Sequence, residues 1–123
     1  MMGNPVGWFE IYVDDMARAK AFYQTVLGVT LEKLPSPGIE MEAFSSEMNQ
    51  YGAGGALVHM PGFSAGRNST LVYFSCQDCA NEASRVVAAG GKIEKPKFSI
   101  GEYGFISLAY DTEGNMFGLH SLS

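Results

Sequence analysis

The stretch from Trp8 to Gly28, WFEIYVDDMARAKAFYQTVLG, predicts one strand, one turn and one helix. Trp8, Glu10 and Tyr12 alternate with apolar residues, so a pleated strand places these three side chains on one face. Glu10 therefore stands between two aromatic rings. A carboxylate in such a position lies near a rim, pairs with a base or has a function.

The helix in this stretch is expected to begin at Met16 and to run to about Leu27. Asp15 is the candidate N-cap, because its side-chain oxygens can accept hydrogen bonds from the free amides of the first turn. Apolar side chains recur at three- and four-residue steps and form one stripe. Gly28 supplies the left-handed residue that ends the helix.

The rest of the chain repeats this order of elements. Strands are expected at 29–34, 39–45 and 56–60, then a strand at 70–76, a helix at 82–89, and strands at 92–97, 105–110 and 116–121. Residues 61–69, PGFSAGRNS, carry no periodic pattern and are predicted to form a linker. The order strand, helix, three strands therefore occurs on both sides of this linker.

An internal repeat supports this division. An offset of 63 residues carries the cap region Val13-Asp14-Asp15 onto Cys76-Gln77-Asp78, and carries the helix stop Gly28 onto Gly91. Two copies are too few to stack into a solenoid, so the repeat indicates duplicated half-domains. The prediction is a single domain over residues 1–123, made of modules at about 5–60 and 70–122 that are joined by the linker at 61–69.

The composition limits the class of protein. A chain of 123 residues with 46% hydrophobic content is long enough for one domain with a core. A net charge of -5 and a pI near 4.9 disfavour nucleic acid and anionic membranes as partners. A small molecule or another protein is the expected partner. We find no signal-peptide pattern and no apolar run of membrane-spanning length, which predicts a cytoplasmic protein.

Cys76 and Cys79 are the two cysteines of the chain, and their C-x-x-C spacing is compatible with a redox or zinc site. No second cysteine pair follows to complete a zinc site. A structural role is favoured, because a free cysteine mostly behaves as a small buried hydrophobic residue.

The chain resembles the vicinal oxygen chelate superfamily, which contains glyoxalases, bleomycin-resistance proteins and extradiol dioxygenases. The residues that carry the resemblance are Val13-Asp14-Asp15, Arg18-Ala19, Phe22-Tyr23, Leu27-Gly28, Ala88-Ala89-Gly90-Gly91 and Asp111-Thr112-Glu113-Gly114-Asn115. The resemblance implies an α+β fold of two βαβββ modules that form an incomplete barrel around a cleft, often in a homodimer. Members of the superfamily catalyse isomerisation, dioxygenation or thiol addition, and others only sequester a ligand.

The resemblance also implies positions for metal ligands, and this sequence departs from the pattern there. The first position is Trp8, whose counterpart in the internal repeat is Leu71. The last position is Gly118, with Leu57 as the expected counterpart. None of these side chains binds a metal, so no cofactor is expected at the usual site.

Each of these four positions is followed, two residues later on the same strand, by a residue with a polar side chain. These residues are Glu10, His59, Tyr73 and His120. If Glu10, His59 and His120 converge, they form a two-histidine, one-carboxylate set that can hold a divalent metal. The simpler alternatives are that Glu10 pairs with an imidazole and presents polar groups to an organic ligand, or that His59 is exposed at a strand end.

The favoured functional hypothesis is a protein that binds a small organic molecule in the cleft, with lyase or isomerase activity next to a carbonyl. Glu10 is the candidate base, because desolvation among aromatic rings would disfavour its charge. His120 and Tyr103 are the candidates that stabilise the enolate. The further candidates for ligand contacts are Trp8, His59, Tyr73, Glu102 and Phe105.

Three other functions stay open at this point. One is a non-catalytic protein that sequesters an antibiotic or a similar small molecule. Another is a metal-dependent, dioxygenase-like enzyme that uses the displaced Glu10, His59 and His120 set. The third is a regulatory module in which the cleft has lost its ligand.

Overall fold

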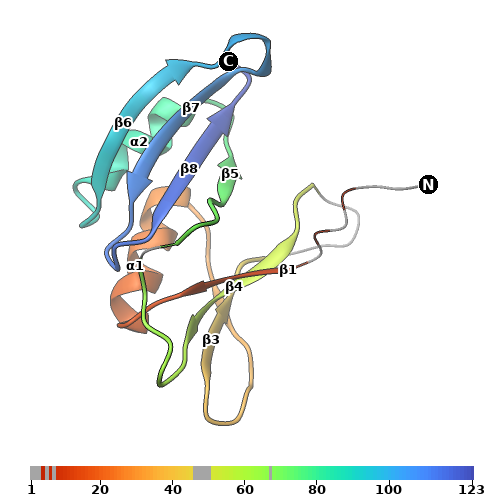
Figure 1. The fold of residues 1–123 in the computed structure, drawn as a ribbon, viewed down its shortest axis with the longest axis vertical. Helices are drawn as coiled ribbons and strands as arrows, with labels where there is room; N and C mark the ends of the chain where they lie inside the picture. Colours follow the sequence, from red (N-terminus) through yellow and green to blue (C-terminus); the bar gives the residue numbers. More distant parts are fainter. Residues whose placement is uncertain (1–3, 5, 7, 46–50, 67) are drawn as a thin grey trace.

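The computed structural model describes residues 4, 6, 8–45, 51–66 and 68–123, and contains two modules with the same order of elements (Figure 1). The first module consists of β1 (Trp8–Tyr12), α1 (Met16–Leu27), β2 (Glu32–Lys33), β3 (Glu40–Ala43) and β4 (Gly54–His59). The second consists of β5 (Tyr73–Ser75), α2 (Cys79–Val86), β6 (Lys92–Ser99), β7 (Phe105–Tyr110) and β8 (Met116–Ser121), with a short 3₁₀ turn η1 (Gly101–Tyr103). The predicted α+β fold of two βαβββ modules is confirmed. Pro5 of the predicted first module and Arg67 of the predicted linker lie outside the described residues.

Both helices begin at the predicted caps. The Asp15 carboxylate accepts a hydrogen bond of 3.1 Å from the amide of Arg18, and Asp78 accepts one of 3.0 Å from the amide of Ala80. Gly28 ends α1 with φ = 68°, a left-handed conformation that glycine adopts without steric cost. The first helix therefore has the predicted bounds, whereas α2 begins earlier than expected, directly after its cap.

Each module forms its own four-stranded mixed sheet. The strand orders are β1-β4-β3-β2 and β5-β8-β7-β6, so β1 and β5 are edge strands that run parallel to their neighbours β4 and β8. The second sheet occupies the upper part of Figure 1 and the first sheet the lower part. Helix α1 packs on β4, and α2 packs on the second sheet and against α1.

The hydrogen bonds after β1 and β5 correct the predicted correspondence between the modules. The amide of Val13 donates to Val58 over 2.8 Å, and the amide of Cys76 donates to His120 over 2.7 Å. Val58 is therefore the counterpart of His120, and two residues earlier Ala56 is the counterpart of Gly118. The predicted counterpart Leu57 was wrong by one residue.

This one-residue difference moves His59 to the other face of the first sheet. Glu10 lies directly opposite Ala56, and His59 lies opposite Glu40. Because side chains alternate between faces, Glu10 and His59 point to opposite sides of the sheet. The prediction that they share a face was wrong.

An aromatic cluster joins the two modules at the core. Phe9 and Phe44 of the first module lie 6.4 and 5.6 Å from the ring of Phe74 in the second, measured between ring centroids. The guanidinium of Arg85 in α2 donates two hydrogen bonds, of 2.7 and 3.1 Å, to the carbonyl of Val26. That carbonyl belongs to the last turn of α1, where helix carbonyls lack partners within the helix.

The helices in the described part of the chain are too short or too polar to cross a lipid bilayer.

Candidate functional site

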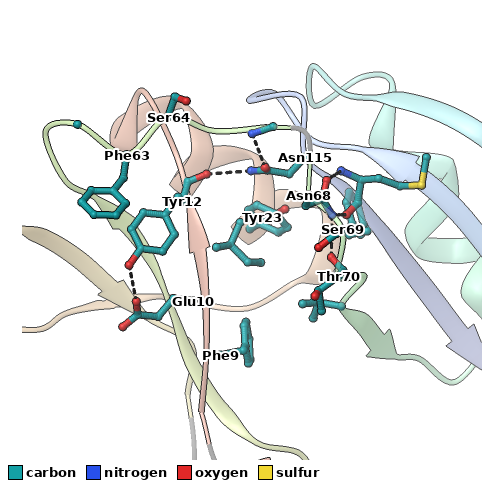
Figure 2. A pocket seen from close by; sticks show the side chains of 16 residues that line it. Phe9, Glu10, Tyr12, Tyr23, Phe63, Ser64, Asn68, Ser69, Thr70 and Asn115 are labelled. Atoms are coloured by element: carbon teal, nitrogen blue, oxygen red, sulfur yellow. Dashed lines mark hydrogen bonds between the residues drawn. The ribbon is translucent and has the colours of Figure 1, made fainter.

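A cleft of about 660 Å³ lies between the edge strand β1 and the described residues of the segment 62–72, which are 62–66 and 68–72 (Figure 2). One wall carries Glu10 and Tyr12, and the opposite wall carries Ser69 and Thr70. Its size suits a small organic molecule.

Two neighbouring side chains of β1 hold the carboxylate of Glu10. The indole Nε1 of Trp8 donates to Oε2 over 3.2 Å, and the hydroxyl of Tyr12 donates to Oε1 over 2.8 Å. The hydrogen bond to Glu10, together with burial and the nearby charge, raises the pKa of Tyr12. Glu10 itself is exposed, so the predicted desolvation of its carboxylate was wrong.

Aromatic rings form the apolar part of the cleft. The rings of Tyr12 and Phe63 lie 5.7 Å apart with an angle of 33° between their planes. Phe9 contributes a third ring, which lies over Gly55 so closely that a Cβ at this position would overlap it. The glycine in β4 therefore creates the space that the Phe9 ring occupies.

Two asparagines fix the walls of the cleft relative to each other. Asn68 donates to the carbonyls of Thr70 and Met116 over 2.8 and 2.9 Å. Asn115 donates to the carbonyl of Tyr12 over 3.0 Å and accepts a bond of 2.7 Å from the amide of Gly66. The connecting segment is thus tied to β1 and to the start of β8.

Behind the cleft, the turn between β7 and β8 caps the helix of the other module. The Glu113 carboxylate accepts hydrogen bonds from the amides of Asp14 and Asp15, over 3.0 and 2.9 Å, and forms an ion pair of 2.6 Å with Arg18. Burial alone would raise the pKa of Glu113, but bonds from Arg18, Thr112 and both amides outweigh it and lower the pKa to about 2. No sequence pattern predicted this role, although the DTEGN turn was part of the family resemblance.

Asp111 occupies the other end of the same turn. It accepts a hydrogen bond of 2.7 Å from the hydroxyl of Tyr23 and bonds of 2.8 Å from the amides of Glu113 and Asn115. Burial raises the pKa of Asp111 in spite of these bonds, and burial beside Asp111 raises the pKa of Tyr23 well above its ordinary value. The turn is a rigid polar support for the cleft.

His120 and Tyr103, the two predicted partners of Glu10, contact each other through the backbone of Tyr103. The imidazole Nε2 of His120 lies 2.7 Å from the carbonyl oxygen of Tyr103. A carbonyl oxygen can only accept, so Nε2 carries the proton of this hydrogen bond. The Tyr103 side chain is 68% exposed. Neither residue lines the cleft that contains Glu10, so the structure does not bring the three predicted catalytic residues together.

The remaining predicted ligand contacts are dispersed. Trp8 contacts Glu10, whereas His59 pairs with Glu40 over 3.1 Å on the opposite face of the sheet. Outside the cleft lie three further residues: Tyr73, whose ring covers Gly118; Glu102, which is exposed in η1; and Phe105, which packs against the core.

The displaced metal site is not formed. Among the described residues, no three His, Cys, Asp or Glu side chains are grouped closely enough to hold a metal ion. Glu10, His59 and His120 therefore do not converge, because the register of β4 directs His59 away from Glu10. That prediction was wrong.

We expect Cys76 to react slowly with thiol reagents in the folded protein. Both cysteines are free, and burial of Cys76, followed by the influence of Glu82, raises the pKa of its thiol to about 12. Since the thiolate is the reactive form, alkylation by iodoacetamide at pH 8 should modify neither Cys76 nor the buried Cys79 until denaturant is added. Rapid labelling of Cys76 without denaturant, measured by mass spectrometry, would contradict this expectation.

Comparisons with known proteins agree with the fold. A putative glyoxylase named CFP32, from Mycobacterium bovis, is 27% identical over 118 residues, which are 95% of this chain and 45% of that protein. The chain thus spans less than half the length of this relative. Glyoxalase I from Zea mays has 21% identity and a TM-score of 0.76, with 95% of this chain and 46% of the maize chain covered. TnmS3, an antibiotic binding protein from Streptomyces sp. CB03234, has 24% identity and a TM-score of 0.71, with 100% and 99% covered.

The two structural likenesses establish the fold alone, because both identities are low. The assignment of a family rests on a match to a family model, which covers residues 6–119. That range includes the first module, the second module as far as the middle of β8, the cleft and the capping turn. The chain therefore belongs to the Glyoxalase/Bleomycin resistance protein/Dioxygenase superfamily.

Proposed function

We propose that this protein binds a small organic molecule in the cleft between β1 and the segment 62–72. The observation that carries the proposal is the lining, which combines aromatic rings, neutral hydroxyl and amide groups, and the carboxylate of Glu10. Such a mixture of apolar surface and a few fixed polar groups is typical of ligand sites. TnmS3, an antibiotic binding protein with the same fold, provides a precedent for such binding.

A screen of ligands by thermal denaturation tests this proposal. A molecule that fills the cleft should raise the melting temperature, because ligand that binds only the folded state stabilises it. At a concentration of about 100 times Kd the stabilisation should be about 2.7 kcal/mol. Phe63→Ala should weaken the binding, and Val87→Ala, which alters an exposed apolar residue directly after α2, should not. A library of aromatic and heterocyclic compounds that yields no stabilising member would contradict the proposal.

A second candidate function is proton abstraction by Glu10 from a carbon next to a carbonyl. The position of the carboxylate in the cleft favours it, and so does the hydrogen bond from the Tyr12 hydroxyl, which holds the carboxylate in place. The step moves a proton from the substrate carbon to Glu10 and leaves an enolate. Incorporation of deuterium from D₂O into a bound carbonyl compound, followed by NMR, would distinguish this chemistry from binding alone. Glu10→Gln should abolish the exchange.

We also propose that the chain acts as a homodimer in the cytoplasm. Trp8, Leu71 and Tyr73 are large apolar side chains with 45%, 37% and 45% of their surfaces exposed. A second copy would cover them. Light scattering should give a particle mass near twice the 13.3 kDa of the chain. A mass that stays at one chain at all concentrations would contradict this prediction. The two free thiols are compatible with a reducing compartment.

A further inference from the structure

We infer that the ligand of this cleft carries an organic cation, a substituted ammonium group that contacts Glu10 and the rings of Tyr12 and Phe63. The inference rests on the proposed function, which it narrows to one chemical class. Three features of the cleft carry it: a negative charge that has no basic partner among the described residues, the fixed position of that charge, and the aromatic surface beside it.

The first feature is the charge of Glu10. Among the described residues, four acidic side chains have a basic partner within 4.0 Å: Glu113 has Arg18, Glu42 has Lys20, Asp78 has Lys97 and Glu40 has His59. The two hydrogen-bond partners of Glu10, Trp8 and Tyr12, are neutral donors, and no ion pair forms at this carboxylate within the described part of the chain. Its negative charge is therefore left for a ligand to balance.

The second feature is the fixed position of the carboxylate. Each oxygen of Glu10 accepts one hydrogen bond, from Trp8 or from Tyr12. An ionised carboxylate has about four acceptor positions, so about two remain for a ligand. Because the two donors already hold the side chain, a ligand does not have to order it on binding.

The third feature is the aromatic surface. Tyr12 and Phe63 form a tilted pair with ring centroids 5.7 Å apart, and both line the same cleft as Glu10. The face of an aromatic ring attracts an alkylated ammonium group, which is less strongly hydrated than a lysine side chain. A carboxylate and ring faces together favour a bulky organic cation over a small metal ion, since a metal ion would need several oxygen or nitrogen ligands.

The other described residues of the cleft carry no charge that would repel a cation. Its other polar side chains are the hydroxyls of Ser64, Ser69, Thr70 and Tyr23 and the amides of Asn68 and Asn115, all of which are neutral. The net charge of -5 on the chain adds a weak long-range attraction for cations. An anionic ligand would meet Glu10 without a compensating group among the described lining residues.

A matched pair of probes tests the inference. Choline and 3,3-dimethylbutan-1-ol have the same shape, but only choline is charged. We expect choline to bind at least about tenfold more tightly in phosphate buffer of low ionic strength. Trp8 is the only tryptophan of the chain and donates to Glu10, so its fluorescence should change with choline binding. Dissociation constants of all variants are measured independently by ligand-observed NMR.

Two variants with the same change in net charge test whether the preference for choline comes from Glu10. Glu10→Gln should remove the preference for choline, whereas Glu94→Gln, which changes an exposed carboxylate on β6, should retain it. Phe63→Ala should weaken choline binding by about three- to tenfold, because it removes one ring face.

Several outcomes would overturn the inference. Equal affinities for the two probes, or a preference for choline that survives Glu10→Gln, would show that this carboxylate does not select a cation. Absence of binding by both probes would also overturn it. If neutral compounds from the ligand screen still stabilise the protein, the proposed function stands and only the cationic class is excluded.

Discussion

Replacing Glu113 by alanine is expected to lower the free energy of unfolding by about 3 kcal/mol, the largest effect of any single change considered for this protein. The Glu113 side chain is fully buried, and its carboxylate accepts bonds from the amides of Asp14 and Asp15 and from the guanidinium of Arg18. Truncation leaves both amides without an acceptor at the start of α1. Urea denaturation at pH 7 measures the loss.

Two comparisons identify the cause of that loss. Glu113→Gln keeps an oxygen that can accept from the amides but removes the charge, so it should lose less stability than the alanine variant. Glu94→Ala removes an exposed carboxylate and should change the free energy of unfolding by less than about 0.5 kcal/mol. If Glu113→Ala were as stable as Glu94→Ala, the capping role of Glu113 would be refuted.

The second large effect is a loss of stability in acid. The pKa of Glu113 falls from its ordinary 4.5 to about 2 on folding, which corresponds to about 3 kcal/mol. Because the folded pKa is the lower one, this stabilisation is complete above pH 4.5 and disappears as the pH falls towards about 2. Asp111 has the opposite effect on stability. Burial raises its pKa above the ordinary 3.8, so its negative charge destabilises the folded protein at neutral pH.

The net result depends on both groups, so the experiment compares two proteins. Denaturation of the natural protein and of Glu113→Gln should be followed from pH 7 to pH 2.5. The difference in stability between them should be largest at pH 7 and should shrink below about pH 4.5, where Glu113 takes up a proton in the unfolded state. A difference that stays constant with pH would show that the Glu113 charge contributes nothing.

Local patterns in the sequence were sufficient to predict the helices and the order of the elements. The cap and stop of α1, Asp15 and Gly28, act through their own backbone neighbours, so residue types at fixed spacing determine them. The alternation of Trp8, Glu10 and Tyr12 also predicted that the three share a face, as their mutual hydrogen bonds confirm.

The register of β4 could not be predicted in the same way. Ala56, Leu57 and Val58 are consecutive apolar residues, and all three are buried. A strand with apolar residues on both faces carries no alternation that identifies the inner face. The assignment of His59 to the face of Glu10 failed for this reason, and with it the displaced metal site.

The capping role of Glu113 depends on contacts between residues that are 98 and 99 positions apart in the chain. No local pattern marks such a pair, because a carboxylate in a turn is more commonly solvated. The partners of Glu10, by contrast, are two residues away on the same strand. The candidate site was therefore predictable where its contacts are local, and not where they cross between the modules.

The position of Glu113 means that the first module does not supply all of its own capping contacts. The helix of the first module receives its carboxylate from the second, and the aromatic cluster draws rings from both. Covalent connection keeps the carboxylate near its amides at a high effective concentration. The capping contact is therefore independent of protein concentration, whereas two separate halves would first have to find each other in solution.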